Sequence, residues 1–267
     1  MRFDLHCHTK EGSFDSKIPI TEYATKYMML GYDGFMITDH NSYKGCKAWD
    51  EISNRPEYKN ITVLKGIEYD TKDAGHVLVI LPDGMYPSLL QIRGMRCKKL
   101  AHLVHFFGGI LGPAHPFGIP SSSTMGFKLM SEKLLSYMDF VEVFNTCEKP
   151  LSNELAMELA DKYNLPGFAG TDAHDSQYIG MAYTDIAADI HCNNDLIAAI
   201  HNEVTITAGG VEREETLKGK AKDHWISQIG YTIYNRGIAK LSMPARKLAH
   251  KNLFKEYNLD SDYLDKY

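Results

Sequence analysis

Apolar residues recur along this chain in two alternating patterns. Short runs rich in β-branched and aromatic residues predict strands, and longer stretches with apolar residues three or four positions apart predict helices. Strands are expected at residues 2–8, 34–38, 61–68, 76–81, 108–114, 139–144, 165–170, 181–186 and 203–207. Helices are expected at residues 20–30, from near 43, and at 88–107, 150–163 and 194–201.

The first two strands indicate how the strands pair. The helix at 20–30, which stops at Gly31, lies between them, and a crossover of this length implies parallel pairing. The carboxyl ends of parallel strands lie at the same edge of a sheet. Side chains that follow each strand are therefore expected to gather at that edge, however far apart they are in the sequence.

Two histidines mark the end of the first strand. Side chains alternate along a strand, so His6 and His8 point to the same face. A turn at Gly12 and Ser13 then lets the carboxylate of Asp15 fold back toward them. Two histidines at this spacing also occur by chance, so the pair indicates a metal site only together with the residues that follow.

Histidines and carboxylates recur at later strand ends and adjoining turns. The full set is His6, His8, Asp15, His40, Glu68, His76, His115, Asp172 and His174. Nitrogen and oxygen donors without sulfur are typical of zinc, manganese or iron sites, and nine donors are too many for one ion. Carboxylates shared between ions, here Glu68 and Asp172, would let two or three cations lie close together.

Other polar residues allow structural interpretations. Asp39 either belongs to this cluster or caps the helix that starts near Tyr43. Glu142 is expected to support a ligand through a hydrogen bond rather than to bind metal directly. His102 and His105 are interpreted as ordinary helix residues. Pro116 is expected to keep His115 extended.

Composition narrows the class of protein. With 267 residues and 44% apolar content, the chain can form one α/β barrel, although two smaller domains also fit. Its five cysteines show no CxxC spacing, which argues against disulfides and thiolate zinc sites. A net charge of −5 disfavours nucleic acid as a partner, and no run of about 18 apolar residues predicts a membrane span. We therefore expect a cytoplasmic protein.

The motifs together resemble the PHP (polymerase and histidinol phosphatase) family of metal-dependent phosphoesterases. The matching stretches are HCHT at 6–9, SFD at 13–15, TDH at 38–40, GIE at 66–68, HVLVI at 76–80, AHP at 114–116 and TDAH at 171–174. The resemblance implies a distorted (β/α)7 TIM-like barrel over residues 1–210 with a trinuclear metal site. Some relatives carry a long insertion between the positions of His76 and His115, and here that interval is short.

The resemblance also implies which residues bind each metal. The first metal would take His6, His8, Glu68 and Asp172, the second Glu68, His76 and His115, and the third Asp15, His40 and His174. Bound cations lower the pKa of water, so a metal-bridging hydroxide is the expected nucleophile. Asp39 and His174 are candidate catalytic proton handlers. The candidate phosphate-binding cations are Lys10, Lys44, Arg93 and Arg213.

Three functions follow, in order of preference. The first is hydrolysis of a small phosphate ester, such as a nucleotide, histidinol phosphate or a sugar phosphate. The second is a PHP-type nuclease or proofreading exonuclease acting on single-stranded nucleic acid, and the third is a non-catalytic metal-bound scaffold.

Residues 211–267 are expected to form a helical extension, with helices at 223–234 and 244–257. This extension is expected to pack on the barrel or to join a homo-oligomer.

Overall fold

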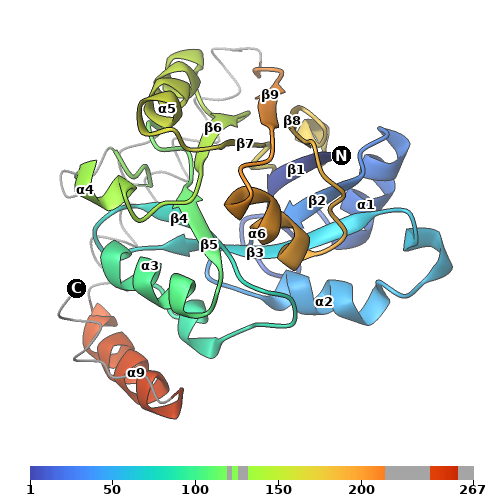
Figure 1. Ribbon diagram of the computed structural model, residues 1–267. Helices are drawn as coiled ribbons and strands as arrows, with labels where there is room; N and C mark the ends of the chain where they lie inside the picture. The colour runs from blue at the N-terminus through green and yellow to red at the C-terminus, as the bar shows by residue number, and fades with distance from the viewer. Residues whose placement is uncertain (119–121, 126–131, 214–240, 258–267) are drawn as a thin grey trace. The chain divides into compact units, whose positions relative to one another are not determined.

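The computed structural model describes residues 1–118, 122–125, 132–213 and 241–257 (Figure 1). The chain divides into two compact units, Met1–Glu212 and Arg213–Tyr267. The first unit contains all the expected strands and all nine candidate metal ligands. In the second unit the described helix is α9 (Met243–Glu256), close to the expected helix, whereas the helix expected at 223–234 lies outside the described residues.

Nine strands are described in the first unit. They are β1 (Arg2–Cys7), β2 (Gly34–Ile37), β3 (Thr62–Asp70), β4 (His76–Ile80), β5 (Ile110–Pro113), β6 (Val141–Asn145), β7 (Gly167–Gly170), β8 (Ala182–Ile186) and β9 (Ile206–Gly210). Seven form one sheet in the order β5-β4-β3-β2-β1-β8-β9, and β6 pairs with β7. The large sheet curls into a half barrel (Figure 1), in agreement with the α/β, TIM-like architecture expected from the sequence.

The pairing is parallel only in part of the large sheet. As predicted, β1 and β2 are parallel, and β3 is parallel to β2, but β4 runs antiparallel to both β3 and β5. His76 begins β4 and lies opposite Asp70 near the end of β3. An antiparallel strand brings its amino end to the edge where its parallel neighbours end. This explains how a histidine at a strand start joins residues at strand ends.

The helices and 3-10 turns connect the strands. In the first unit they are α1 (Ile20–Met29), α2 (Lys44–Ile52), η1 (Pro56–Tyr58), η2 (Ser88–Gln91), α3 (Cys97–Phe106), α4 (Glu132–Leu135), α5 (Pro150–Tyr163), η3 (Ser176–Tyr178) and α6 (Asn193–His201). The single helix expected at 88–107 is wrong, because η2 and α3 are separate. Gly94, at a φ of +95°, lies between them, and the Tyr69 hydroxyl donates to Ile92 O (2.6 Å). The intervening segment therefore bonds to β3 rather than continuing a helix.

Apolar side chains fill the interior between the two sheets. Phe140 and Phe168 stack with their ring centroids 4.1 Å apart, and both belong to a buried cluster with Phe3 and Leu5 of β1. The Thr184 hydroxyl donates to the carbonyl of Ala169, which joins β7 to the large sheet. These contacts hold the end of β7 near the end of β1. In the described part of the chain, no helix is apolar over a length that could span a membrane.

Candidate metal centre

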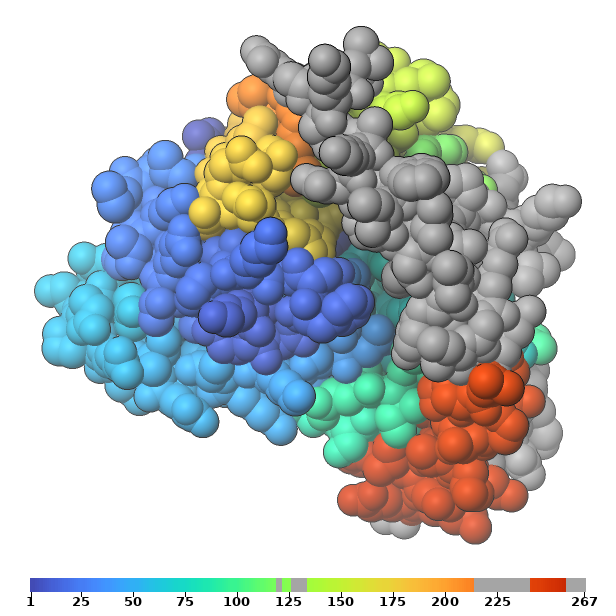
Figure 2. All heavy atoms as spheres, turned by 180° about the vertical axis from the view of Figure 1, so that it is seen from behind, coloured from blue at the N-terminus to red at the C-terminus, as the bar shows by residue number. Residues whose placement is uncertain are grey.

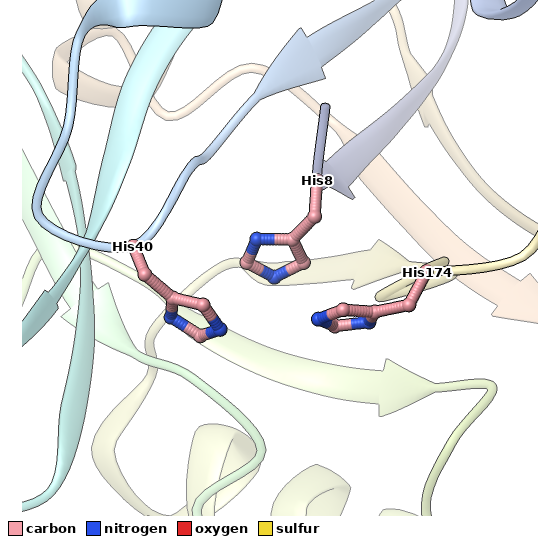
Figure 3. Close-up of side chains that lie close together, drawn as sticks. All are labelled: His8, His40 and His174. Carbon is pink, nitrogen blue, oxygen red and sulfur yellow. The ribbon is translucent and has the colours of Figure 1, made fainter. Parts of the chain in front are cut away.

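The end of β1 supplies the most buried part of the site. His6 and His8 are fully buried, and their Nε2 atoms lie 3.1 Å apart, on one face as the strand alternation predicts. His8 also stacks with the rings of His40 and His174. Figure 3 shows these three imidazoles, from three separate segments, converging on one space.

Glu68 lies at the centre of the cluster. This glutamate is 1% exposed and ends the β-branched run of β3. Its Oε1 lies 2.7 Å from His76 Nδ1 and 2.9 Å from His115 Nε2, and its Oε2 lies 2.8 Å from His40 Nδ1. One carboxylate thus contacts three imidazoles from three segments, which is the arrangement expected of a ligand shared between cations.

Two further carboxylates complete the cluster. Asp172 Oδ1 lies 3.0 Å from His8 Nε2, after the end of β7. Asp15 Oδ2 lies 3.4 Å from His40 Nε2 and 3.5 Å from His174 Nε2, so the turn after β1 does fold back as expected. All nine residues proposed from the sequence therefore lie in one cluster.

The distances between ligand atoms group the residues differently from the family resemblance. Within the described residues, three groups have ligand atoms all within 4.8 Å of one another: His8, His40 and His174; His6, His8 and Glu68; and His40, Glu68 and His76. His8 and His40 each occur in two groups, whereas the family resemblance gives each of them to one metal. The assignment of ligands to individual metals therefore stays a prediction.

Glu142 supports two of the histidines from outside the cluster. Its Oε1 accepts from His6 Nδ1 (2.8 Å), and its Oε2 accepts from the His115 backbone N–H (2.5 Å) and from Asn145 Nδ2 (3.2 Å). These contacts favour the supporting role that the sequence suggested. A carboxylate on Nδ1 fixes the ring and leaves Nε2 to face the centre.

The carboxylate of Asp39 is connected to the cluster through Ser13. The Ser13 hydroxyl donates to Asp39 Oδ1 (3.0 Å) and lies 3.2 Å from His8 Nδ1, while Asp39 also accepts from Thr9 N (2.6 Å) and Thr9 Oγ1 (2.8 Å). The helix-capping alternative is wrong, because Tyr43 precedes α2 and no side chain caps that helix. Asp39 instead holds the loop that carries Ser13.

Sequence reasoning missed Asp4, which lies beneath the centre. Its buried carboxylate accepts from His6 N (3.0 Å), from Thr171 N (3.1 Å) and Oγ1 (2.6 Å), and from the Tyr27 hydroxyl. It thereby fixes both the end of β1 and the segment that carries Asp172. A signal was present, because Asp4 is two residues before His6 and alternation puts both on one face.

Charge in the centre is unbalanced without cations or protons. With Nδ1 of His6 donating to Glu142 and Nδ1 of His8 to Ser13, both Nε2 lone pairs point inward toward carboxylates. Burial lowers the pKa of His6, but nearby carboxylates, Glu142 first among them, raise it well above its ordinary value. Burial raises the pKa of Glu68, but neighbouring imidazoles, led by His76, hold it well below its ordinary value. A buried cluster of converging acceptors fits divalent cations.

Backbone strain accompanies the cluster. Asn41, His115 and Asp172 have positive φ values of 48°, 29° and 48°. The expectation that Pro116 keeps His115 extended is therefore wrong. The bond from His115 N–H to Glu142 and the contact of its ring with Glu68 hold this strained conformation. Strain of this kind is commonly found where function demands a fixed side-chain position.

Two other histidines lie away from the centre. His102 and His105 are on α3, as expected of ordinary helix residues, and His105 Nε2 lies 3.0 Å from Asp139 Oδ2. Neither occurs in the groups of ligand atoms found among the described residues. His105 therefore provides a control residue for experiments on the site.

Comparisons with known proteins agree with this geometry. A family model described as "PHP domain" matches residues 4–139, and one described as "PHP-associated" matches residues 150–205. No curated protein matches the chain.

Similar solved structures share the fold at low sequence identity. A complex of Endonuclease Q with a 27-mer duplex substrate has a TM-score of 0.61 at 16% identity, covering 79% of this chain and 60% of that chain. PsfC from Pseudomonas syringae has a TM-score of 0.59 at 16% identity, and the match covers 89% of this chain and 98% of the PsfC chain. The third structure is a two-domain protein from Bacteroides vulgatus that contains a predicted PHP-like metal-dependent phosphoesterase. It has a TM-score of 0.61 at 18% identity, and the match covers 83% of this chain and 69% of that chain. The chain thus spans about 60% of the length of the Endonuclease Q chain.

Proposed function

Because this chain belongs to the PHP domain family of metal-dependent phosphoesterases, we propose that it hydrolyses a small phosphate monoester. The observation that carries the proposal is the convergence of nine imidazole and carboxylate side chains, Glu68 among them, in one cluster. A chain that had kept the fold without the activity would be expected to have lost part of this set, and here all nine residues are present.

The cluster would hold two or three divalent cations. His6, His8, Glu68 and Asp172 would bind the most buried ion, Glu68 would be shared with a second at His76 and His115, and Asp15, His40 and His174 would bind a third. When bound, zinc, manganese or iron ions supply activated water and positive charge that neutralises the phosphate oxygens.

The residues of the chain would orient these ligands and move protons. Glu142 and Ser13 fix the rings of His6 and His8, and Asp39 holds Ser13 in place. We therefore assign Asp39 to positioning rather than to proton transfer, since its oxygens already accept three hydrogen bonds. His174 keeps its assignment as a candidate proton handler for the form with two cations, in which its Nε2 binds no metal, because 32% of its side chain is exposed at the edge of the cluster.

Arg93 is the best placed of the four candidate phosphate-binding cations. It forms an ion pair with Asp70, which is two residues beyond Glu68 on β3 and directly opposite His76. Alternation along β3 puts the side chains of Glu68 and Asp70 on one face. Arg93 is partly exposed, and a guanidinium group can bind two phosphate oxygens at once.

The proposal is tested by loading the purified protein separately with manganese, zinc and iron. Each form is then assayed for inorganic phosphate release from a panel of phosphate monoesters and diesters. We expect turnover of at least one monoester, and a loss of turnover in Glu68→Ala at retained circular dichroism. Equal turnover by Glu68→Ala and the wild type would refute the proposal. Metal binding without turnover of any ester would favour the scaffold alternative.

A nuclease is the second candidate, and the fold likeness to Endonuclease Q supports it. The net charge of −5 argues the other way, although bound divalent cations would make the centre itself more positive. Cleavage of labelled single-stranded and duplex DNA, at increasing salt concentrations, separates the two candidates. A nuclease should bind its substrate through phosphates and lose affinity steeply as salt rises, and a monoesterase should not.

A further inference from the structure

The loop between β1 and α1 exposes an aromatic side chain at the metal centre. Phe14 is 91% exposed, whereas Ser13 and Ser16 are 2% and 6% exposed. Asp15 and Lys17, the other polar residues next to it, are exposed. Burying a phenylalanine side chain is usually favourable, and burying a hydroxyl usually is not. Phe14 is therefore the exception in this stretch, since Ile18 and Ile20, which follow it, are buried.

Hydrogen bonds on both sides of Phe14 fix the loop. Ser13 N–H donates to Thr9 O (2.8 Å), and the Ser16 hydroxyl donates to His8 O (2.6 Å). At the ends of the loop, Lys10 N–H donates to Ile18 O (2.8 Å), and Lys17 N–H donates to His174 O (3.2 Å). The exposed ring is thus carried by a backbone that is bonded to the centre itself.

Both neighbours of Phe14 in the sequence contact candidate ligands. The Ser13 hydroxyl lies 3.2 Å from His8 Nδ1, and Asp15 Oδ2 lies 3.4 Å from His40 Nε2. The backbone of Phe14 therefore lies at the rim of the cluster, and its exposed side chain projects from there into solvent. On the face drawn in Figure 2, the dark blue amino-terminal residues and the gold residues that follow β7 lie side by side at the surface, in agreement with the bond from Lys17 to His174.

We propose that Phe14 stacks against a planar ring of the substrate, and that this ring is a nucleobase. The inference rests on the proposed function, because cations in the centre would hold the phosphate while the rest of the ester extends over the rim. A base stacked on an aromatic side chain contributes binding energy without needing a matched set of hydrogen bonds. The hydrogen-bonded backbone of the loop suits this role, because binding then needs to order only the side-chain torsions of Phe14.

The first test compares two esters that differ only in the base. The wild type and Phe14→Ala are assayed with a nucleoside 5′-monophosphate and with ribose 5-phosphate. We expect the ratio of kcat/KM for the nucleotide over the sugar phosphate to fall about tenfold in Phe14→Ala and to recover in Phe14→Trp. Phe106→Ala is the matched control, because Phe106 is also exposed, at 67%, but lies on α3.

The second test measures binding directly. In Phe14→Trp, stacking should quench the fluorescence of the new indole when the nucleoside monophosphate is added, and ribose 5-phosphate should leave it unchanged. A short single-stranded oligonucleotide forms a third arm, and quenching by it alone would identify the base as part of a strand.

The outcomes separate this inference from the proposed function. Wild-type hydrolysis with an unchanged ratio in Phe14→Ala, and no quenching by either base-bearing probe, would overturn the role of Phe14 and leave the phosphoesterase standing. A metal-loaded wild type that hydrolyses neither ester nor any other would overturn both.

Discussion

The two sides of the metal cluster differ in burial. The side formed by His6, His8 and Glu68 is closed to solvent, with side-chain exposures of 0%, 0% and 1%. The side formed by Asp15 and His174 is open, with exposures of 35% and 32%. Ligands that are buried and already oriented bind a cation with little loss of entropy, so the closed side should bind more tightly and the open side should exchange more readily.

The closed side also has more supporting contacts. Glu142 and Ser13 bond to the outer nitrogens of His6 and His8, whereas His174 Nδ1 donates to the carbonyl of nearby Asp172 (3.0 Å). A carboxylate orients an imidazole and increases its basicity more than a carbonyl does. We infer that the closed side fixes the geometry of catalysis, and that the open side admits substrate and water.

The largest expected effect comes from His8, which belongs to the groups on both sides. His8→Ala should lower turnover about a thousandfold or more, because it disturbs both groups of ligands at once. Turnover of the metal-loaded variant is measured beside its circular dichroism spectrum. His105→Ala, on α3, should retain wild-type turnover. A His8→Ala protein within tenfold of wild type would remove His8 from the site.

A smaller effect is expected at the support of the closed side. Glu142→Gln keeps the size of the side chain but removes its charge, and should weaken binding of the tightest metal about 10- to 100-fold. Competition with a fluorescent chelator measures the affinity. Asp15→Asn, on the open side, should instead weaken only the most labile metal. If the two variants weakened the same ion equally, the distinction between the two sides would be lost.

Arg93 offers a test beside the closed side. Arg93→Lys keeps the positive charge but removes the two-pronged contact that we propose with phosphate, so KM should rise about tenfold while kcat changes less. Steady-state kinetics with the best monoester from the panel measures both constants. Arg96→Lys, at an exposed position just before α3, is the matched control. A fall in kcat with no change in KM would argue against substrate binding by Arg93.

The smallest expected effect concerns the stability of the metal-free protein. Burial lowers the pKa of His115, but the Glu68 carboxylate outweighs burial and raises it to about 9. A histidine with a higher pKa in the folded than in the unfolded protein stabilises the fold. The full contribution is present at pH values below the unfolded pKa, and it disappears as the pH rises through the folded pKa.

The metal-free protein should therefore lose several degrees of melting temperature between about pH 6.5 and pH 9 through this linkage. Bound metal replaces the protons, so the metal-loaded protein should lose less over the same interval. Thermal unfolding followed by circular dichroism measures both forms. An equal loss in the two forms would show that protons and metal do not compete for this cluster.

The spacing of apolar residues along the chain was enough to predict most helices and strands. The helix at Pro150–Tyr163 has the predicted bounds, and β1 to β3 are parallel as the crossover helix requires. The single helix expected at 88–107 was wrong because the side chain and backbone of β3 compete for the segment around Gly94. Helical periodicity records apolar spacing but not such bonds to a distant strand.

The sequence by itself determined which side chains meet. Alternation along β1 and the polar residues at strand ends predicted most of the set, because a parallel sheet brings those ends to one edge. His76, at the start of β4, did not follow from this rule. Only the tertiary structure decided how they are arranged: the antiparallel β4 that carries His76, the strained backbone of His115, and the supporting contacts of Asp4 and Glu142. The physical reason is that local spacing sets the direction of a side chain, whereas hydrogen bonds, strain and burial depend on residues far away in the sequence.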